Sequence, residues 1–430
     1  MLKNKNIYLI PIFGFILVIL IGWIILMMPF CNNGNITPLD SLFTAVSATC
    51  VNGLTTVCLS KEYTFLGQIV IACITEIGAI GFVTFISLII SIKKKKMQLS
   101  ETLLLSNALN DNDYNRLKQR LKEVIKYTLI IELIGAICLA VEFIPIFGVR
   151  RGIWYSVFHS ITAFCNAGFD LFGDSSLMMF ANNVYINVVF IILMILGGIG
   201  FFVIEDIIRC IKKKSFIHME FHTKNVLTTS LIIYFLSVVL TKISQPDLTI
   251  LQVLFMSSTI RTTGFSTINM ETTSMSTKVL FSILMMIGGA PGSTSGGIRI
   301  TSIAILILTV RATLRNKKEV TVFYKKIDIQ TIKQAITNIF VCNLIIMIAV
   351  VIFANIQNIG LLEMIFMCVS AFSATGFSIV NMSVLKVASK IILILLMFIG
   401  RIGPISILSV FILKKKENKN IEYVSGNLML

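Results

Sequence analysis

Long apolar stretches recur along the 430-residue chain and indicate its fold class. Seven stretches of 15 to 28 residues stand out, and most are close to the roughly 20 residues that a helix needs to cross a bilayer. Glu76 interrupts one of them and Arg401 another. The first is too long for a signal-peptide core, so we expect it to remain as a membrane helix. The stretches are Ile7–Phe30, Phe65–Ile92, Val184–Ile204, Val226–Leu240, Val279–Ile298, Ile339–Ile356 and Ile391–Leu413.

Four shorter segments lie between the long stretches, and each is followed by a glycine. A helix of about 12 residues rises ~18 Å, roughly half of a ~30 Å hydrocarbon core. Such a segment must turn back within the membrane, and its loop must be buried in protein or line water, because lipid cannot satisfy the backbone. The alternative is four ordinary helices packed in a bundle. At the start of the first segment, Asp40 suits a helix N-cap. The segments are Pro38 to about Cys50, Tyr155–Cys165, Leu251–Ile260 and Leu362–Ser373.

Two glycine motifs recur four times in register, which indicates an internal fourfold repeat. The first motif closes each short segment and reads Val51-Asn52-Gly53-Leu54, Asn166-Ala167-Gly168-Phe169, Thr262-Thr263-Gly264-Phe265 and Ala374-Thr375-Gly376-Phe377. The second follows 24 to 29 residues later and reads Gly78-Ala79-Ile80-Gly81, Gly197-Gly198-Ile199-Gly200, Gly288-Gly289-Ala290-Pro291-Gly292 and Gly400-Arg401-Ile402-Gly403. Repeat boundaries are expected at residues 1–112, 113–214, 215–325 and 326–430. The later repeats open with helices at Val124–Phe147, Val226–Leu240 and Ile339–Ile356. The predicted fold is an all-α membrane protein. Its four pseudo-fourfold repeats of helix, re-entrant pore loop and helix, with two full-length helices each, surround one central pore.

A ring of four glycine loops has the chemistry of a cation site. Glycine adopts a left-handed φ without a Cβ penalty, so successive carbonyls can turn toward one axis. The half helices would point their C-terminal ends, each with a partial charge of about −0.5, at the same axis. The predicted ion-binding residues are Asn52, Gly53, Ala167, Gly168, Thr263, Gly264, Thr375 and Gly376.

The run from Gly288 to Gly297 must break its membrane helix. It lacks the Lys-Ser/Thr ending of a phosphate-binding loop and lies at membrane depth, so nucleotide binding is a poor interpretation. Arg401 stands at the position of Ala79, Gly198 and Gly289 in the other repeats. A single arginine at this depth needs interior partners, and the segment Ser293–Ser295 offers carbonyls and hydroxyls. The alternatives are a merely kinked helix and an arginine that extends to the membrane interface.

The formal charge of +16 is concentrated on one side of the predicted topology. That side carries 27 of the 37 Lys and Arg residues, and the opposite side carries 8, among them Arg261 and Lys390. This asymmetry predicts that both termini lie in the cytoplasm. The basic tracts lie at helix ends without interleaved aromatic platforms, so anionic lipids or a cytoplasmic partner are favoured over nucleic acid. These tracts are Lys93–Lys96, Lys212–Lys214 and Lys414–Lys416.

The remaining chemistry-bearing residues do not converge on a catalytic site. The nine cysteines show no metal-ligand spacing, although a disulfide between Cys31 and Cys58 is one alternative. Glu76, Glu132 and Glu142 are acidic residues in or near membrane stretches, where they could relay a coupling ion or proton or could act as structural partners. No nucleophile and base occur together, so neither an embedded hydrolase nor any other enzyme is supported.

With these motifs the chain resembles the TrkH/Ktr/HKT superfamily of potassium transporters, and most closely the membrane subunit of bacterial Ktr systems. The resemblance covers about residues 7 to 413. The sequence departs from the usual pattern at four positions: Asn52 replaces the usual Thr, Glu76 a common Gln, Ala79 a common Gly, and Phe377 a frequent Leu. The matching runs are Cys50–Leu54, Phe164–Phe169, Arg261–Phe265, Ser373–Phe377, Gly288–Gly297 and Phe398–Pro404.

The resemblance implies K⁺ uptake across a bacterial plasma membrane, with K⁺ held at the backbone carbonyls of a selectivity filter. It implies a gate beneath the filter, built from Arg401 and from Gly288, Gly289, Gly292, Ser293, Thr294, Ser295, Gly296 and Gly297. It also implies a homodimer on a cytoplasmic nucleotide-binding ring of the RCK/KtrA type, some dependence on Na⁺, and no cofactor in this chain. A Na⁺-selective or non-selective transporter of the same fold remains an alternative, as does an alternating-access carrier.

Overall fold

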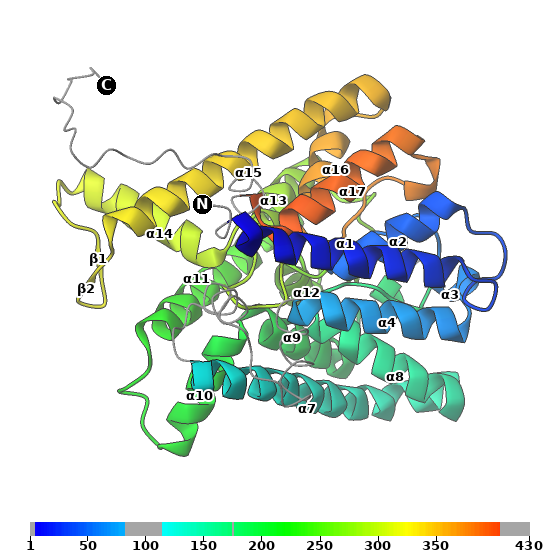
Figure 1. The fold of residues 1–430 in the computed structure, drawn as a ribbon, viewed down its shortest axis with the longest axis horizontal. Coiled ribbons are helices and arrows are strands. Elements are labelled where there is room, and N and C mark those ends of the chain that lie inside the picture. Colours follow the sequence, from blue (N-terminus) through cyan, green and yellow to red (C-terminus); the bar gives the residue numbers. More distant parts are fainter. Residues whose placement is uncertain (1–4, 82–113, 174–175, 405–430) are drawn as a thin grey trace.

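The computed structural model describes residues 5–81, 114–173 and 176–404, and these are mostly helical, with one short two-stranded hairpin (Figure 1). The tracts Lys93–Lys96 and Lys414–Lys416 lie outside the described residues, as do the later parts of the predicted stretches Phe65–Ile92 and Ile391–Leu413.

Twelve of the described helices form four units, each with a long helix, a half helix and a second helix in that order. The first unit has α1 (Lys5–Met27), α2 (Pro38–Cys50) and α4 (Phe65–Ile80), and the second has α7 (Tyr114–Phe147), α8 (Val149–Phe164) and α9 (Val184–Gly198). The third has α11 (Phe221–Ser244), α12 (Ile250–Thr259) and α13 (Met275–Met285), and the fourth has α15 (Ile329–Ile356), α16 (Leu361–Ser373) and α17 (Val387–Ile402).

The other described elements connect these helices. They are α3 (Leu59–Glu62), α10 (Phe201–Lys212), α14 (Ile300–Leu314), two 3₁₀ turns (Ser176–Phe180 and Met382–Val384) and an antiparallel hairpin of β1 (Thr321–Val322) and β2 (Lys325–Lys326). In the hairpin Thr321 pairs with Lys326, and Val322 pairs with Lys325.

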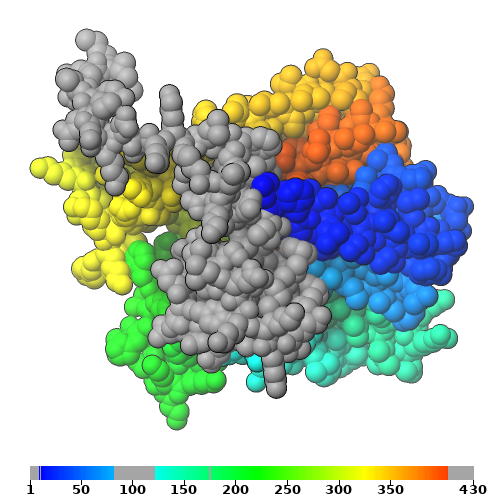
Figure 2. All heavy atoms as spheres, in the orientation of Figure 1, coloured from blue at the N-terminus to red at the C-terminus, as the bar shows by residue number. Residues whose placement is uncertain are grey.

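The four units close into a ring. The second helix of each unit packs against the half helix of the next: α4 on α8, α9 on α12, α13 on α16, and α17 back on α2. The first and last units are therefore neighbours, and Figure 2 shows their blue and orange surfaces in contact. This arrangement places the half helices at the centre, where most of their side chains are buried.

The predicted half helices are confirmed, with α8 starting six residues earlier than expected. The interpretation of Asp40 as the N-cap of α2 is wrong. Thr37 is the N-cap, and its side chain accepts a hydrogen bond from the backbone N–H of Asp40. The carboxylate of Asp40 instead forms a 2.9 Å ion pair with Lys390 of α17, so a residue that the sequence assigns to a cap joins the first and last units.

Three of the four second helices differ from the expected full-length spans, because glycines with φ near +90° stop or bend them. Gly81 and Gly403 end α4 and α17 with φ of 87° and 91°. At Gly200 (φ 90°) the chain bends by 102° between α9 and α10. Glycine is favoured at such φ values because a Cβ would be strained there.

Among the described residues, three helices are long and apolar enough to cross a bilayer: α11, α15 and the Lys122–Phe147 part of α7. The bent pair α9 and α10 would make a fourth span. These helices carry large exposed apolar side chains such as Leu133, Ile232 and Met347. Lipid is the natural neighbour of such surfaces in a chain this apolar.

Candidate ion pathway

The four half helices end at the four predicted glycine loops. After three of the half helices, a residue in the left-handed conformation turns the chain into the loop. These residues are Val51 after α2, Asn166 after α8 and Ala374 after α16, with φ of 57°, 58° and 55°. The third loop has no such residue at its corresponding position, Thr262. All four loop glycines have positive φ, namely 95° at Gly53, 70° at Gly168, 93° at Gly264 and 84° at Gly376.

These glycines form a closed ring with the residues that precede them. A Cβ on Gly53 would collide with the carbonyl oxygen of Ala167, and one on Gly168 with that of Thr263. In the same way Gly264 faces the carbonyl of Thr375, and Gly376 faces that of Asn52. The structure therefore brings together all eight residues that the sequence predicts for ion binding. Glycine is required at each ring position both by its φ and by the neighbouring carbonyl.

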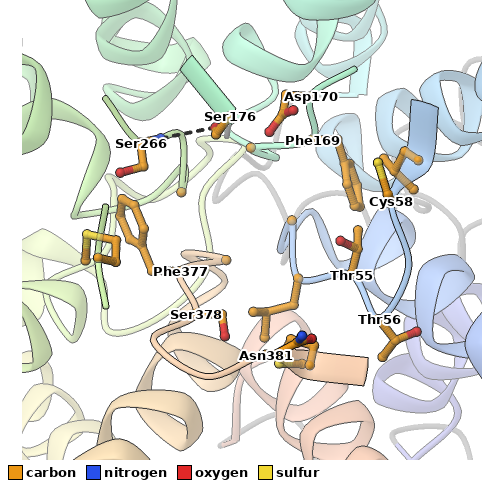
Figure 3. Close-up of a pocket in the computed structure, with 18 of the residues that line it drawn as sticks. Thr55, Thr56, Cys58, Phe169, Asp170, Ser176, Ser266, Phe377, Ser378 and Asn381 are labelled. Carbon is orange, nitrogen blue, oxygen red and sulfur yellow. Dashed lines mark hydrogen bonds between the residues drawn. The ribbon is translucent and has the colours of Figure 1, made fainter. Parts of the chain in front are cut away.

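A vestibule of about 570 Å³ opens above the ring, and all four ring glycines line it (Figure 3). Its described lining includes the acidic residues Glu62, Asp170 and Glu271 and no Lys or Arg. Hydroxyl and amide side chains such as Thr55, Ser378 and Asn381 make up much of the remainder (Figure 3). A cavity lined by one sign of charge raises the local concentration of ions of opposite sign, so this one attracts cations.

The predicted loop Gly288–Gly297 is non-helical and lies between α13 and α14. Its backbone contacts the second unit, because the N–H of Ala290 donates to the carbonyl of Gly198 at 3.0 Å. On the other side, Gly296 and Gly297 lie against the backbone of Ser373, at the end of α16. The loop thus occupies the level just below the ring, between the second and fourth units.

Arg401 connects this loop to the first unit. Its guanidinium is buried; Nη1 donates to the carbonyl of Thr294, and Nη2 donates to the carbonyls of Gly78 at 2.5 Å and Ala79 at 3.1 Å. Contact with the segment Ser293–Ser295 is therefore confirmed, and the alternative of a side chain that extends to the membrane interface is wrong. The carbonyls of the first unit are partners that the sequence did not predict.

Two further arginines take places that the sequence did not predict. Arg299, which lies just beyond the loop in the chain, donates from Nη1 to the carbonyl of Ser295 at 2.7 Å and so stabilises the end of the loop. The only sequence signal was its position two residues after the glycine run. Arg261, which the predicted topology assigns to the outer side, lies two residues beyond the end of α12 and two residues before the ring residue Thr263.

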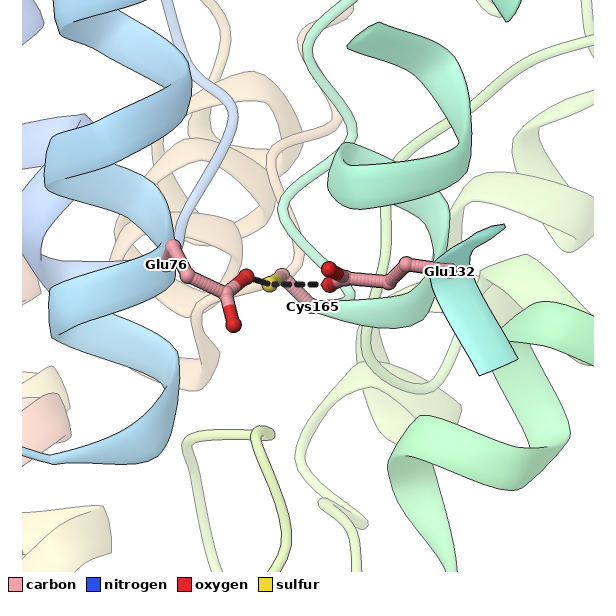
Figure 4. Close-up of side chains that lie close together, drawn as sticks. All are labelled: Glu76, Glu132 and Cys165. Atoms are coloured by element: carbon pink, nitrogen blue, oxygen red, sulfur yellow. Dashed lines mark hydrogen bonds between the residues drawn. The ribbon is translucent and has the colours of Figure 1, made fainter. Parts of the chain in front are cut away.

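The acidic residues divide into two cases. Glu142 accepts a hydrogen bond from Asn183 at 3.2 Å, which is a structural contact at the start of α9. Glu76 of α4 and Glu132 of α7 face each other across the thiol of Cys165 (Figure 4). The sulfur lies 3.1 Å from Glu76 Oε2 and 3.8 Å from Glu132 Oε1, three residues before ring glycine Gly168. Cys31 and Cys58 are free thiols.

Comparison with known proteins identifies the family. Residues 4–423 match the family model described as TrkH, cation transport protein. The chain is 35% identical over 426 residues to Ktr system potassium uptake protein B of Bacillus subtilis, covering 96% of this chain and 94% of that protein. It is 34% identical over 436 residues to potassium/sodium uptake protein NtpJ of Enterococcus hirae, covering 97% and 95%.

The fold is similar to the crystal structure of the potassium transporter TrkH from Vibrio parahaemolyticus, with a TM-score of 0.75. That match covers 95% of this chain and 85% of the other at 15% identity, so it shows likeness of fold alone. Because the family model and both curated relatives cover nearly the whole chain, this protein belongs to the TrkH family of cation transport proteins and is a membrane ion transporter, not an enzyme.

Proposed function

We propose that this protein takes up K⁺ into the bacterial cell through the ring of glycine loops. The observation that carries the proposal is the closure of the ring, in which each ring glycine faces the carbonyl of the residue before the next one. Carbonyl oxygens can replace the water that a cation loses on entry. The names of the relatives, a potassium uptake protein and a potassium/sodium uptake protein, agree with K⁺ as the transported ion.

Electrostatics supports a cation pathway at this place. Removing water from an ion in a low-dielectric medium costs tens of kcal/mol unless protein groups compensate. The half helices end at the ring, and each C-terminus contributes about half a negative charge. The acidic vestibule would concentrate cations above the ring. The membrane potential supplies ~2.3 kcal/mol per charge per 100 mV, enough for a roughly fiftyfold gradient.

The loop Gly288–Gly297 and Arg401 are proposed to form the gate. The loop lies below the ring, and a buried arginine of the fourth unit holds it by a hydrogen bond to Thr294. The charge of Arg401 would also repel a cation at this level. Opening then requires the loop to leave the hydrogen bond at Thr294.

We further propose a homodimer with both termini in the cytoplasm, regulated by a cytoplasmic nucleotide-binding ring. The exposed residues Lys212, Lys213 and Lys214 at the end of α10 would form part of the docking surface, and Lys93–Lys96 and Lys414–Lys416 are two further basic tracts in the sequence. Neutralising these tracts should weaken co-purification with the ring at physiological salt. An undiminished complex would place the docking surface elsewhere.

Ion flux through the purified protein in liposomes tests the function. We expect K⁺ flux to exceed Na⁺ flux, and Gly264→Ser to relax this preference or abolish uptake, because a side chain disturbs the carbonyl ring. Equal flux of both ions would favour a non-selective transporter, and a Na⁺ preference would favour the Na⁺-selective alternative. Flux that requires a counter-transported ion would favour an alternating-access carrier. If Gly→Ser changes at all four ring positions left selectivity unaltered, the ring would not be the filter.

A further inference from the structure

Asn166 joins the ring to the loop below it. This residue is fully buried at the end of α8, in the left-handed conformation that Asn tolerates better than most residues. Its side-chain amide lies 2.7 Å from the hydroxyl of Thr263 and 2.9 Å from the hydroxyl of Thr294. Thr263 supplies the carbonyl that faces Gly168, and Thr294 belongs to the loop. One side chain therefore contacts both structures.

The orientation of the amide follows from its neighbours. With Nδ2 toward the third unit, Asn166 donates to Thr263 Oγ1 and to the carbonyl of Met194 at 3.2 Å. Its Oδ1 then accepts from the Thr294 hydroxyl and from the N–H of Gly198 at 3.1 Å. Both polar atoms are satisfied in this orientation, as a buried amide requires. The two threonine contacts are present in either orientation.

Thr294 is held through both its backbone and its side chain. Its carbonyl accepts from Arg401, and its hydroxyl bonds to Asn166. A loop that moves away from Arg401 also pulls on the amide that positions Thr263. The corresponding residues in the other units provide no such link, since Val51 and Ala374 have apolar side chains and Thr262 contacts Asn166 rather than the loop.

We propose that Asn166 couples the ion preference of the ring to the position of the loop, through its hydrogen bonds to Thr263 and Thr294. This inference rests on the proposed function of the ring as a filter and of the loop as a gate. Asn166 acts as a positioning residue: with the loop in place, it holds Thr263 so that the carbonyl of that residue faces Gly168. When the loop moves, the amide loses the hydroxyl of Thr294, and the third unit's part of the ring loosens.

The test compares Thr294→Val, Thr294→Ser and Ser295→Ala in the full-length protein in liposomes, with the ratio of K⁺ to Na⁺ flux as the readout. Val keeps the β-branched shape and removes the hydroxyl, whereas Ser keeps the hydroxyl. The Thr294 hydroxyl also lies 3.2 Å from the carbonyl of Gly197, so Val removes every contact of this hydroxyl. A loss equivalent to about one buried hydrogen bond predicts that Thr294→Val lowers the ratio by about two- to tenfold, and Thr294→Ser should restore most of it. Ser295 is the matched control, because its hydroxyl has no hydrogen-bond partner among the described residues. Its removal should leave the ratio unchanged, whatever it does to total flux.

If the loop only blocked the passage of ions and had no influence on the ring, substitutions at Thr294 would change total flux but not the ratio of K⁺ to Na⁺ flux. If Thr294→Val changed total flux but left the ratio unchanged, or if Ser295→Ala lowered the ratio equally, the coupling would be wrong. Asn166→Asp, which removes the Nδ2 donor, should also lower the ratio, and in combination with Thr294→Val its effect on the logarithm of the ratio should be less than additive. Full additivity would contradict a shared hydrogen bond. If the wild-type protein passed no cation, the proposed function itself would fail; a K⁺ preference that is insensitive to Thr294→Val would overturn the coupling alone.

Discussion

The ring of glycines and the layer beneath it are built from the same four units, but in opposite ways. In the ring every unit contributes the same part, a glycine with positive φ that faces the carbonyl before the next ring glycine. In the layer beneath, the corresponding positions hold Ala79, Gly198, Gly289 and Arg401. Ala79 offers a carbonyl to Arg401, Gly198 offers one to the loop, and Gly289 is part of the loop itself.

A second set of glycines shows where the units diverge. Gly78, Gly197 and Gly400 pack against the carbonyls of Thr49, Phe164 and Phe372, each of which lies four residues before the ring glycine of its own unit. The third unit breaks this pattern, because Gly288 packs against Gly296 of the loop. If the ring binds the ion as proposed, each unit must contribute in the same way, whereas the proposed gate needs only one unit to supply a loop and another to hold it. Substitutions in the two regions should therefore act in opposite directions on flux.

The largest effect is expected in the ring. Gly264→Ala should reduce K⁺ flux by about a hundredfold, because left-handed strain of about 1–2 kcal/mol adds to about 1–3 kcal/mol of overpacking against the Thr375 carbonyl. Gly34→Ala is the control, because Gly34 has a similar φ of +90° with nothing within 4 Å of an added Cβ. Flux assays in liposomes that show equal losses for the two variants would mean that φ strain alone matters and that the ring contact does not.

A change in the layer should raise flux instead. Arg401→Ala removes a charge-assisted hydrogen bond to Thr294, of about 1.5–3 kcal/mol, and should increase K⁺ flux by about tenfold or more. Arg401→Lys should give a smaller increase, since it keeps the charge but lacks the fork that reaches Thr294, Gly78 and Ala79 together.

Shortening the Gly288–Gly297 run should raise flux as well. If both changes act on the proposed gate, combining this change with Arg401→Ala should increase the logarithm of flux by less than the sum of the single effects. If neither single change raised flux, loop and arginine would be structural, and the contrast between the two regions would lose its meaning.

The smallest effect on flux is expected outside both regions. The ion pair between Asp40 and Lys390 ties the first and last units together, and its side chains are only 11% and 10% exposed. Lys390→Met should lower the free energy of unfolding by about 3 kcal/mol, because it leaves a carboxylate buried without its partner. Adding Asp40→Asn should recover part of this loss. Thermal melting in detergent measures the stability, and the K⁺ to Na⁺ flux ratio should stay unchanged. A shift in that ratio would mean that residues outside the ring and the layer beneath it also influence ion selectivity.

Much of the fold followed from local patterns. The half helices were predictable because each is a short apolar segment closed by a glycine, and their observed bounds agree to within a residue or two except at the start of α8. The ring was predictable because the same glycine recurs in register. The break after α13 was predicted from the run Gly288–Gly297, but those in the other second helices were not, because glycines such as Gly81 and Gly200 look like helix-packing glycines until their φ is known.

The sequence by itself determined which residues are placed in the ring and the loop, since repetition and glycine chemistry are written along the chain. The sequence also indicated the contact of Arg401 with the segment that contains Thr294. Only the tertiary structure decided the other partners across units: Asp40 with Lys390, Arg401 with Gly78, and Asn166 with Thr263 and Thr294. These pairs are separated by roughly one hundred to three hundred and fifty residues in the chain. Such contacts depend on how the units close around the centre. Because a buried polar side chain bonds with whatever groups that closure brings within reach, no local pattern specifies its partner.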